Sequence, residues 1–150
     1  DPSLRYLFLL NNSYFVVSLN LHLPRWYQLS LIFKLAPECK KYMDSYLDVS
    51  WGHVLSCIPK SRFPGPMHCW INTSSLAKFE SAFHKTYQIQ KLWKVPDPRL
   101  RDALRRAIIE RVIAGYRNYQ EEHPELEKHI DRGSSSPEVL EEMLGELFEG

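Results

Sequence analysis

The residues in this sequence that are best placed to do chemistry are cations, and the chemistry that they offer is attraction of an anion. Residues 60–119 carry twelve Lys/Arg against four Asp/Glu, whereas residues 120–150 carry two against ten. Residues 1–59 are nearly neutral, with five against four, so the whole chain has a net charge of only +1. This separation predicts either an internal clasp between the two segments or a basic surface for an anionic partner.

Seven cations form the candidate site for an anionic partner: Lys91, Lys94, Arg101, Arg105, Arg106, Lys128 and Arg132. Two interpretations of the arginines in residues 98–119 stay open. The simpler one is a solvated face whose charges pair with the acidic tail, residues 120–150. The other is binding to an anionic lipid or an acidic protein. We do not expect nucleic acid as a partner, because Trp93, Tyr116 and Tyr119 have the spacing of core residues rather than of an exposed stacking platform.

No catalytic motif is recognisable in the sequence, so we expect a protein that is not an enzyme and that needs no cofactor. There is no phosphate-binding glycine loop, no nucleophile elbow and no His-Glu-x-x-His motif. The three cysteines, Cys39, Cys57 and Cys69, are irregularly spaced, which favours a reducing compartment over a disulfide framework. A zinc site with His53 or His68 is disfavoured, because no Cys-x-x-Cys pair exists.

The element that must position most of these cations is a helix over residues 98–119. Asp97 can cap it through its side-chain oxygen, and Pro98 suits the first helical position. Behind this start, apolar residues recur every four positions, which places them on one face of a helix. They are Leu100, Leu104, Ile108, Val112 and Tyr116. The pattern predicts a long helix with one apolar and one basic side.

The remaining segments also favour helices. Helical spacing predicts elements over residues 4–21, 38–58 and from a Ser74 or Ser75 cap to about residue 91, with less regular ones at 26–35 and 126–130. A last helix is predicted after Ser136 and Pro137. Residues 59–75 are rich in proline and are expected to form a flexible loop. No strand is predicted, so the expected fold is one all-α domain, an antiparallel helical bundle over residues 1–150.

Several further details carry testable expectations. Residues 6–21 are the most apolar, but polar residues interrupt them, so they predict a buried helix packed on several sides rather than a membrane span. This helix has no convincing cap. Asn11 and Asn12 are expected to bond a neighbouring segment, and Gly52 suggests close helix packing. His53 is expected to lie in the core and His123 on the surface.

Several blocks resemble one family along nearly the whole chain. They are Tyr6–Asn12, Ser45–Leu47, Ser50–Gly52, Val54–Cys57, Val95–Pro98 with Leu100 and Arg101, Tyr116 with Arg117, and the ending Leu147–Gly150. In this order they resemble the C-terminal part of the plant seventy-kilodalton exocyst subunit, the Exo70 or exocyst complex component 7 family.

The resemblance implies the end of a rod of stacked helical bundles. Members of this family help to tether secretory vesicles to the plasma membrane, where they are peripheral on the cytoplasmic side. They bind other exocyst subunits, small GTPases and phosphatidylinositol bisphosphate, the last through C-terminal basic residues. The resemblance therefore implies that the seven cations contact a phosphoinositide. Some plant copies are linked to immunity, so the alternative is a diverged copy that does not tether and instead serves as an effector target or decoy.

The sequence departs from the family pattern at two places. The family's tail reads Lys-Tyr-Ile-Lys-Tyr, whereas the matching residues here are Lys128-His129-Ile130-Asp131-Arg132. An acid in place of a lysine weakens attraction to an anionic membrane by about 1 kcal/mol per charge. The family's Pro-Ala before Tyr-Arg is Ala114-Gly115 here, which is expected to loosen the helix at that point.

Overall fold

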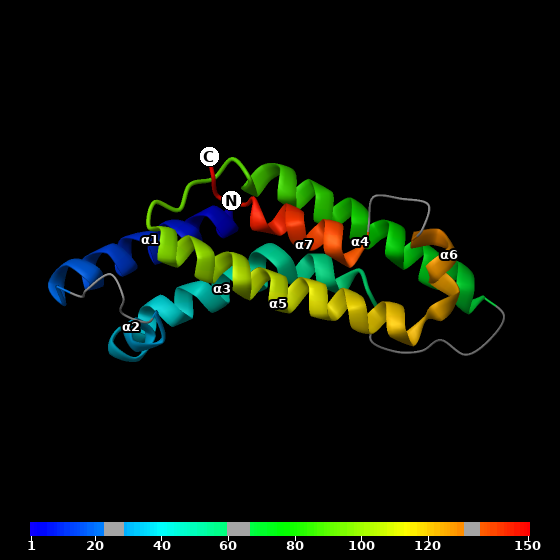
Figure 1. The fold of residues 1–150 in the computed structure, drawn as a ribbon, viewed down its shortest axis with the longest axis horizontal. Coiled ribbons are helices and arrows are strands. Elements are labelled where there is room, and N and C mark those ends of the chain that lie inside the picture. The colour runs from blue at the N-terminus through cyan, green and yellow to red at the C-terminus, as the bar shows by residue number, and fades with distance from the viewer. Residues whose placement is uncertain (23–28, 60–66, 131–135) are drawn as a thin grey trace.

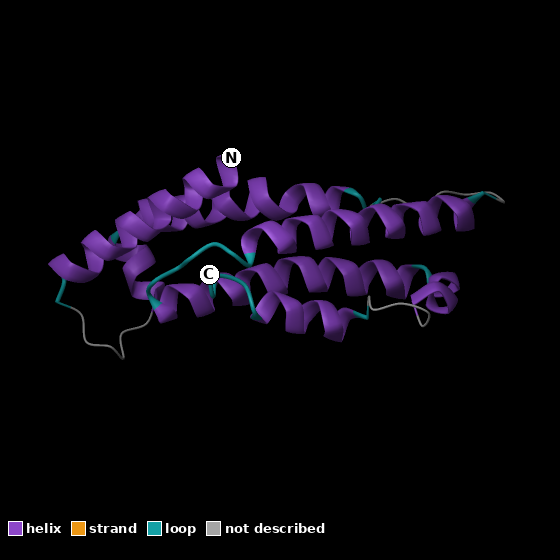
Figure 2. Ribbon diagram, turned by 90° about the horizontal axis from the view of Figure 1, so that it is seen from above, coloured by secondary structure: helices purple, strands orange, loops and turns teal. Residues whose placement is uncertain are grey.

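Every regular element in the described residues is a helix, so the all-α prediction is confirmed (Figure 1). The computed structural model describes residues 1–22, 29–59, 67–130 and 136–150. The elements are α1 (Pro2–Asn20), α2 (Leu29–Leu35), α3 (Pro37–Ser56), α4 (His68–Gln90), α5 (Pro98–Glu122), the 3-10 turn η1 (Pro124–Leu126), α6 (Glu127–Ile130) and α7 (Pro137–Gly145). Figure 2 shows them from above, as an elongated bundle without strands in the described ranges.

Helix α5 is the central element and begins as the sequence predicts. The Asp97 carboxylate accepts hydrogen bonds from the backbone N–H groups of Arg99 and Leu100 at 2.9 and 3.2 Å. Burial opposes ionisation of this carboxyl, but hydrogen bonds from Arg99 and Leu100 outweigh it and lower the pKa of Asp97. The predicted apolar face is buried along its whole length and packs against α2, α3, α7 and η1.

The core lies where α3, α4 and α5 meet, and large aromatic side chains fill it. Phe79 stacks on Tyr116 at 4.7 Å between ring centroids, and Trp51 lies 5.7 Å from Phe83. The Tyr46 hydroxyl donates to Gln90 Oε1 at 2.5 Å inside this core. Burial raises the pKa of Tyr46, so the hydroxyl keeps its proton and remains a donor.

Helix α1 is less enclosed than the sequence predicts. Its buried residues face α3, with which it makes most of its contacts; they are Ser3, Leu7, Leu10 and Tyr14. Its opposite side is open, and Phe8 and Phe15 are 64% and 60% exposed. The expectation of packing on several sides is therefore wrong. None of the helices in the described ranges combines the length and the apolar character needed to cross a membrane.

The expectations at the polar residues of α1 are met in part. The helix does have a cap, because the Asp1 carboxylate accepts a hydrogen bond from the Ser3 backbone at 2.8 Å. Asn11 donates to the Lys94 carbonyl at 3.4 Å, as expected, and so ties α1 to the segment before α5. Asn12 instead donates to Phe8 of its own helix at 2.7 Å.

Helix α4 begins at His68, so the prediction of a loop through residue 75 is wrong for residues 68–75. Ser74 and Ser75 lie inside the helix, and the N-cap position is Met67. The physical reason is tertiary: the buried Asn72 side chain is bonded to residues after α5, and this holds the first turns in place. Residues 60–66 of the predicted loop and 26–28 of the predicted segment 26–35 lie outside the described residues.

Gly52 of α3 and Gly115 of α5 exchange the roles expected of them. A Cβ at Gly52 would meet nothing within 4 Å, so close packing is not what requires glycine there. At Gly115 a Cβ would lie 2.8 Å from Leu55 Cδ2 of α3. Helix α5 is not broken at Gly115 but continues to Glu122. The residue expected to loosen the helix instead allows α3 and α5 to approach closely.

The C-terminal residues fold back onto the segment that joins α4 and α5. The Ser136 hydroxyl caps α7 by accepting from Val139, as predicted, at 3.3 Å. After α7, Leu147 and Phe148 are fully buried, and Phe148 has a positive φ of 67° that turns the chain. Glu149 then forms an isolated antiparallel bridge with Lys94. Figure 1 shows the C-terminus beside this segment.

Candidate partner-binding surfaces

Five of the seven predicted cations lie at the end of the bundle where α4 passes into α5. Lys91 follows the last turn of α4, and its Nζ stands 5.5 Å from the centre of the Tyr87 ring, within cation–π range. Lys94 is exposed in the connecting segment. Arg101 is half-buried on the first turns of α5, and Arg106 is exposed on the same helix. No ion pair involves Arg106 among the residues that the structure describes.

Arg105, the fifth of these cations, is already engaged by the C-terminal residues. Its Nε and Nη2 donate to the Leu147 carbonyl oxygen at 2.9 and 2.5 Å, and Nη2 also donates to Glu149. The Arg105 side chain is only 15% exposed. The hydrogen bond from Arg105 is the main cause that lowers the pKa of Glu149. Arg105 therefore acts first as an anchor for the end of the chain.

Lys128 lies far from this group. It is exposed on α6, which follows the C-terminal end of α5, whereas Lys91, Lys94 and Arg101 lie at its N-terminal end (Figure 1). The 25 residues of α5 make a helix of about 37 Å. The predicted cations therefore form two separate groups rather than one site. Arg132 lies outside the described residues.

The expected internal clasp is present at two α5 arginines. Arg105 pairs with Glu149, and Arg117 lies 3.5 Å from Glu138 and 3.2 Å from Glu141 of α7. Arg111 instead pairs with Asp48 of α3. The acidic tail thus neutralises part of the basic face, in agreement with the simpler of the two interpretations.

A buried polar network escaped the sequence analysis. The Asn72 Nδ2 lies 2.9 Å from His123 Nδ1 and 3.0 Å from Glu125 Oε1, and the Tyr119 hydroxyl donates to the Asn72 carbonyl at 3.2 Å. His123 is only 5% exposed, so the prediction that it lies on the surface is wrong. His53, predicted in the core, is exposed, although its Nε2 lies 3.2 Å from the Thr86 hydroxyl. The network holds α4, α5 and η1 together at one end of the bundle.

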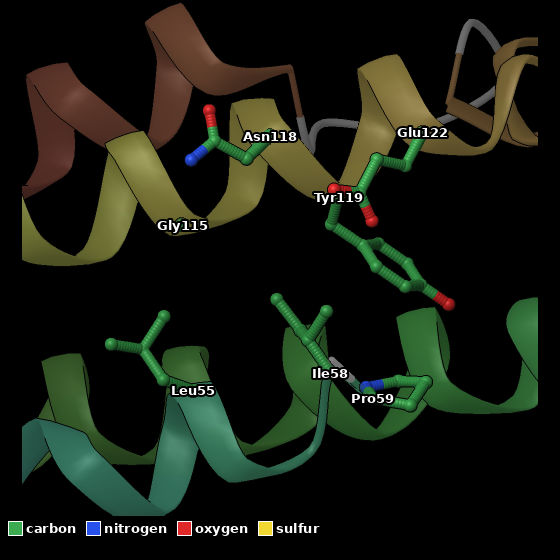
Figure 3. Close-up of a pocket in the computed structure, with 7 residues that line it drawn as sticks. All are labelled: Leu55, Ile58, Pro59, Gly115, Asn118, Tyr119 and Glu122. Atoms are coloured by element: carbon green, nitrogen blue, oxygen red, sulfur yellow. The ribbon is translucent and has the colours of Figure 1, made fainter. Parts of the chain in front are cut away.

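The surface also has concave features, and two of them border α5. Figure 3 shows a cleft of about 280 Å³ between α3 and the last turns of α5, where Leu55 and Ile58 point towards α5. Gly115 leaves room above Leu55, and Asn118 and Glu122 stand on the α5 side. A larger groove of about 420 Å³ runs between α1 and the segment 94–100. It is lined by Phe8, Asn11, Asn12, Tyr14, Phe15, Ser18, Lys94, Pro96, Asp97 and Leu100.

These features define a class of protein: an all-α helical bundle whose candidate sites are surfaces suited to binding. Within the described part of the chain, no three His, Cys, Asp or Glu side chains are grouped so that they could hold a metal ion. The surfaces offer exposed cations at both ends of α5, an apolar cleft and an apolar groove.

The sequence comparisons show the family. The family model for the C-terminal part of Exo70, a component of the exocyst complex, matches residues 1–146, so the chain belongs to the Exo70 family. It is 26% identical to "Exocyst complex component EXO70C1" of Arabidopsis thaliana, over 100% of this chain and 24% of that protein. It is 27% identical to EXO70A1 (100% of this chain, 26% of the relative) and 30% identical to EXO70B2 (93% and 21%), both from the same plant. The chain spans about a quarter of the length of these relatives.

Proposed function

We propose that this chain is a non-catalytic part of an exocyst subunit, and that it helps to tether secretory vesicles to the cytoplasmic side of the plasma membrane by binding other exocyst subunits. The observation that carries this proposal is the match of the Exo70 C-terminal family over residues 1–146. The helical surfaces support it, because a bundle with exposed charged and apolar patches is suited to recognition. Small GTPases are further candidate partners.

A phosphoinositide contact is the finer part of the proposal, and the exposed cations support it. Lys94 and Arg106 are exposed near the start of α5, with Lys91 and Arg101 nearby in the chain. Arg105 is a poorer candidate, because its guanidinium is held by Leu147 and Glu149. Lys128 offers a second, separate point of contact on α6, and Arg132 stays a candidate from the sequence alone.

One structural observation favours the alternative function, a diverged interaction module of plant immunity that binds a pathogen effector and does not tether. The acidic α7 and the C-terminal residues pair with Arg117 and Arg105, which reduces the charge available to a membrane. Asp131 adds an anion where the family pattern has a lysine. The two functions differ in whether the chain binds an anionic membrane.

Liposome flotation separates them. The chain is mixed with vesicles of neutral lipid, with or without phosphatidylinositol bisphosphate, at low and at physiological salt. The test variant is Lys94→Glu with Arg106→Glu. The matched control is Lys78→Glu with Lys85→Glu, which makes the same charge change at two exposed positions of α4. Salt-sensitive binding that the test variant loses and the control keeps would support the lipid contact.

Absence of binding at low salt would refute the lipid contact and leave the alternative function.

The exocyst assignment has its own test, which is a pull-down of purified plant exocyst subunits with the chain as bait. Capture of at least one of them at physiological salt is expected. If none is retained, the chain does not contribute to assembly by itself, and the proposed role in tethering is refuted.

A further inference from the structure

The polar network around Asn72 determines where the protons of its members lie. The Asn72 Nδ2 is 3.0 Å from Glu125 Oε1, and an ionised carboxylate only accepts hydrogen bonds, which assigns this atom as the amide nitrogen. The same nitrogen lies 2.9 Å from His123 Nδ1. Because an amide nitrogen only donates, Nδ1 must accept and carries no proton. The arrangement therefore requires a neutral His123 with its one ring proton on Nε2.

The His123 ring is enclosed by groups from α4, α5 and η1. It is 5% exposed, and its Nε2 is buried without a hydrogen-bond partner among the described residues. Three groups face the ring: the Asn72 amide, the Tyr119 ring at 4.6 Å between centroids, and the Glu125 carboxylate, 3.4 Å from Nδ1. Burial raises the pKa of Tyr119, so Glu125 is the only one of the three that is charged near neutral pH.

We propose that His123 is a proton switch, which loosens the start of α4 from η1 when the pH falls. A second ring proton can be placed only on Nδ1, where it points at the N–H group of Asn72, and two donors repel each other. Glu125 can accept this proton's hydrogen bond instead, because its side chain is 28% exposed and has room to turn towards the ring. Asn72 Nδ2 then loses both of its acceptors.

The bonds that are exchanged differ in what they hold together. Those of Asn72 join α4 to His123 and Glu125, which lie more than fifty positions later in the chain. The pair of His123 with Glu125 joins residues two apart, so it does not hold α4. The Tyr119 hydroxyl still donates to the Asn72 carbonyl at 3.2 Å, so α4 is loosened rather than detached. Because the loosened arrangement holds one proton more, acid favours it.

Two observations make the switch sensitive to a single proton. Histidine is the side chain that ordinarily changes charge between about pH 5 and 8. The closed arrangement also contains a buried donor without a partner, Nε2–H, and loosening allows water to reach it, which lowers the free-energy difference between the two arrangements. All the contacts involved are internal and lie at the end of the bundle that carries α6 (Figure 1). The inference does not depend on the proposed function.

Nuclear magnetic resonance of the unmodified chain tests both parts of the proposal. At about pH 8, His123 is expected to carry its proton on Nε2, and a proton on Nδ1 would overturn the proposal. Between about pH 7.5 and 5.5, the amides of residues 72–76 are expected to lose about tenfold of their protection against hydrogen exchange, after correction for the intrinsic effect of pH. The amides of residues 46–54 in α3 should keep theirs. Unchanged protection of residues 72–76 at the lower pH would also overturn the proposal.

Three variants identify the group that titrates. His123→Gln is expected to make the protection of residues 72–76 equal at the two pH values. The matched control is His84→Gln, which removes a half-buried histidine of α4 and should keep the fall in protection. Glu125→Gln still accepts from Asn72 but offers no negative charge to a protonated ring, so the fall should move to lower pH. A fall that persists in His123→Gln, or that stays at the same pH in Glu125→Gln, would refute the switch.

Discussion

Replacing Arg105 by methionine separates its structural role from a role in binding anions. Methionine keeps much of the length and the aliphatic packing of arginine but has no donor. The variant removes the hydrogen bonds to the Leu147 carbonyl and to Glu149. The C-terminal residues Leu147 and Phe148, which are fully buried, would then lose their anchor on α5.

The expected cost follows from the geometry of this contact. The Arg105 side chain is 15% exposed, and two of its N–H groups share one carbonyl oxygen, so we count them as one charged hydrogen bond. Such a bond contributes about 1.5–3 kcal/mol, and we expect Arg105→Met to lower the free energy of unfolding by about 2 kcal/mol. For a domain of this size, that corresponds to a fall in Tm of about 4–8 °C.

Urea unfolding, followed by far-ultraviolet circular dichroism, measures this change. Arg106→Met is the matched control, because it removes a neighbouring arginine that is exposed, and its effect should stay within about 0.5 kcal/mol. Glu149→Gln removes only the exposed partner and should cost less than Arg105→Met. If Arg105→Met and Arg106→Met lower the free energy of unfolding equally, Arg105 does not anchor the C-terminal residues. Arg105 would then again be a candidate for binding an anionic partner.

Three further predictions concern the pH dependence of the Arg105–Glu149 contact, two glycines in helices, and Asn72. Arg105 holds the pKa of Glu149 below its usual 4.5, so the contact stabilises the fold above that pH. This stabilisation is lost as the pH falls through the lowered pKa. The difference in Tm between the wild type and Glu149→Gln should therefore disappear in acid. Gly52→Ala should stabilise the chain by about 0.5–1 kcal/mol in urea unfolding, because its Cβ meets nothing. Gly115→Ala should gain less, because its Cβ would lie 2.8 Å from a side chain of α3. Asn72→Ala should cost about 1–3 kcal/mol in the same assay, because it leaves buried polar partners unpaired.

The parts of the fold that local sequence decides were predictable. Asp97 with Pro98, and Ser136 with Pro137, each start a helix through a side-chain cap and a proline at its first position. The apolar period of four then marks the buried face of α5. These signals act over a few neighbouring residues, so they can be read without knowledge of the fold.

The errors arise where contacts between distant residues decide. Proline-rich sequence before residue 68 suggested a loop to residue 75, but Asn72 is fixed by residues more than fifty positions later and lies in the first turns of α4. His123 is buried by the same contacts. The glycine that packs closely is Gly115 rather than Gly52, because only Gly115 faces a neighbouring helix at short range. None of these partners is adjacent in the sequence.

The candidate site was predictable in its charge but not in its arrangement. The block charges predicted either a clasp or a basic surface for a partner, and Arg105 and Arg117 do pair with the acidic tail. The predicted helix over residues 98–119 already separates Lys94 from Lys128, but the sequence analysis placed both in one candidate site. The sequence also could not show that the C-terminal residues enclose Arg105. The contact is made to the backbone carbonyl of Leu147, and the pattern of side chains in a sequence does not reveal backbone contacts.

The wide separation of Lys94 and Lys128 has a consequence for orientation. A flat anionic membrane that contacts both lysines must lie parallel to the long axis of the bundle. If only one lysine contacts the membrane, the long axis can instead point away from the membrane surface. The two poses differ in adsorbed-layer thickness by roughly the difference between the length of a 25-residue helix, near 37 Å, and the width of a few packed helices. Neutron reflectometry on a supported bilayer would register which posture the molecule takes.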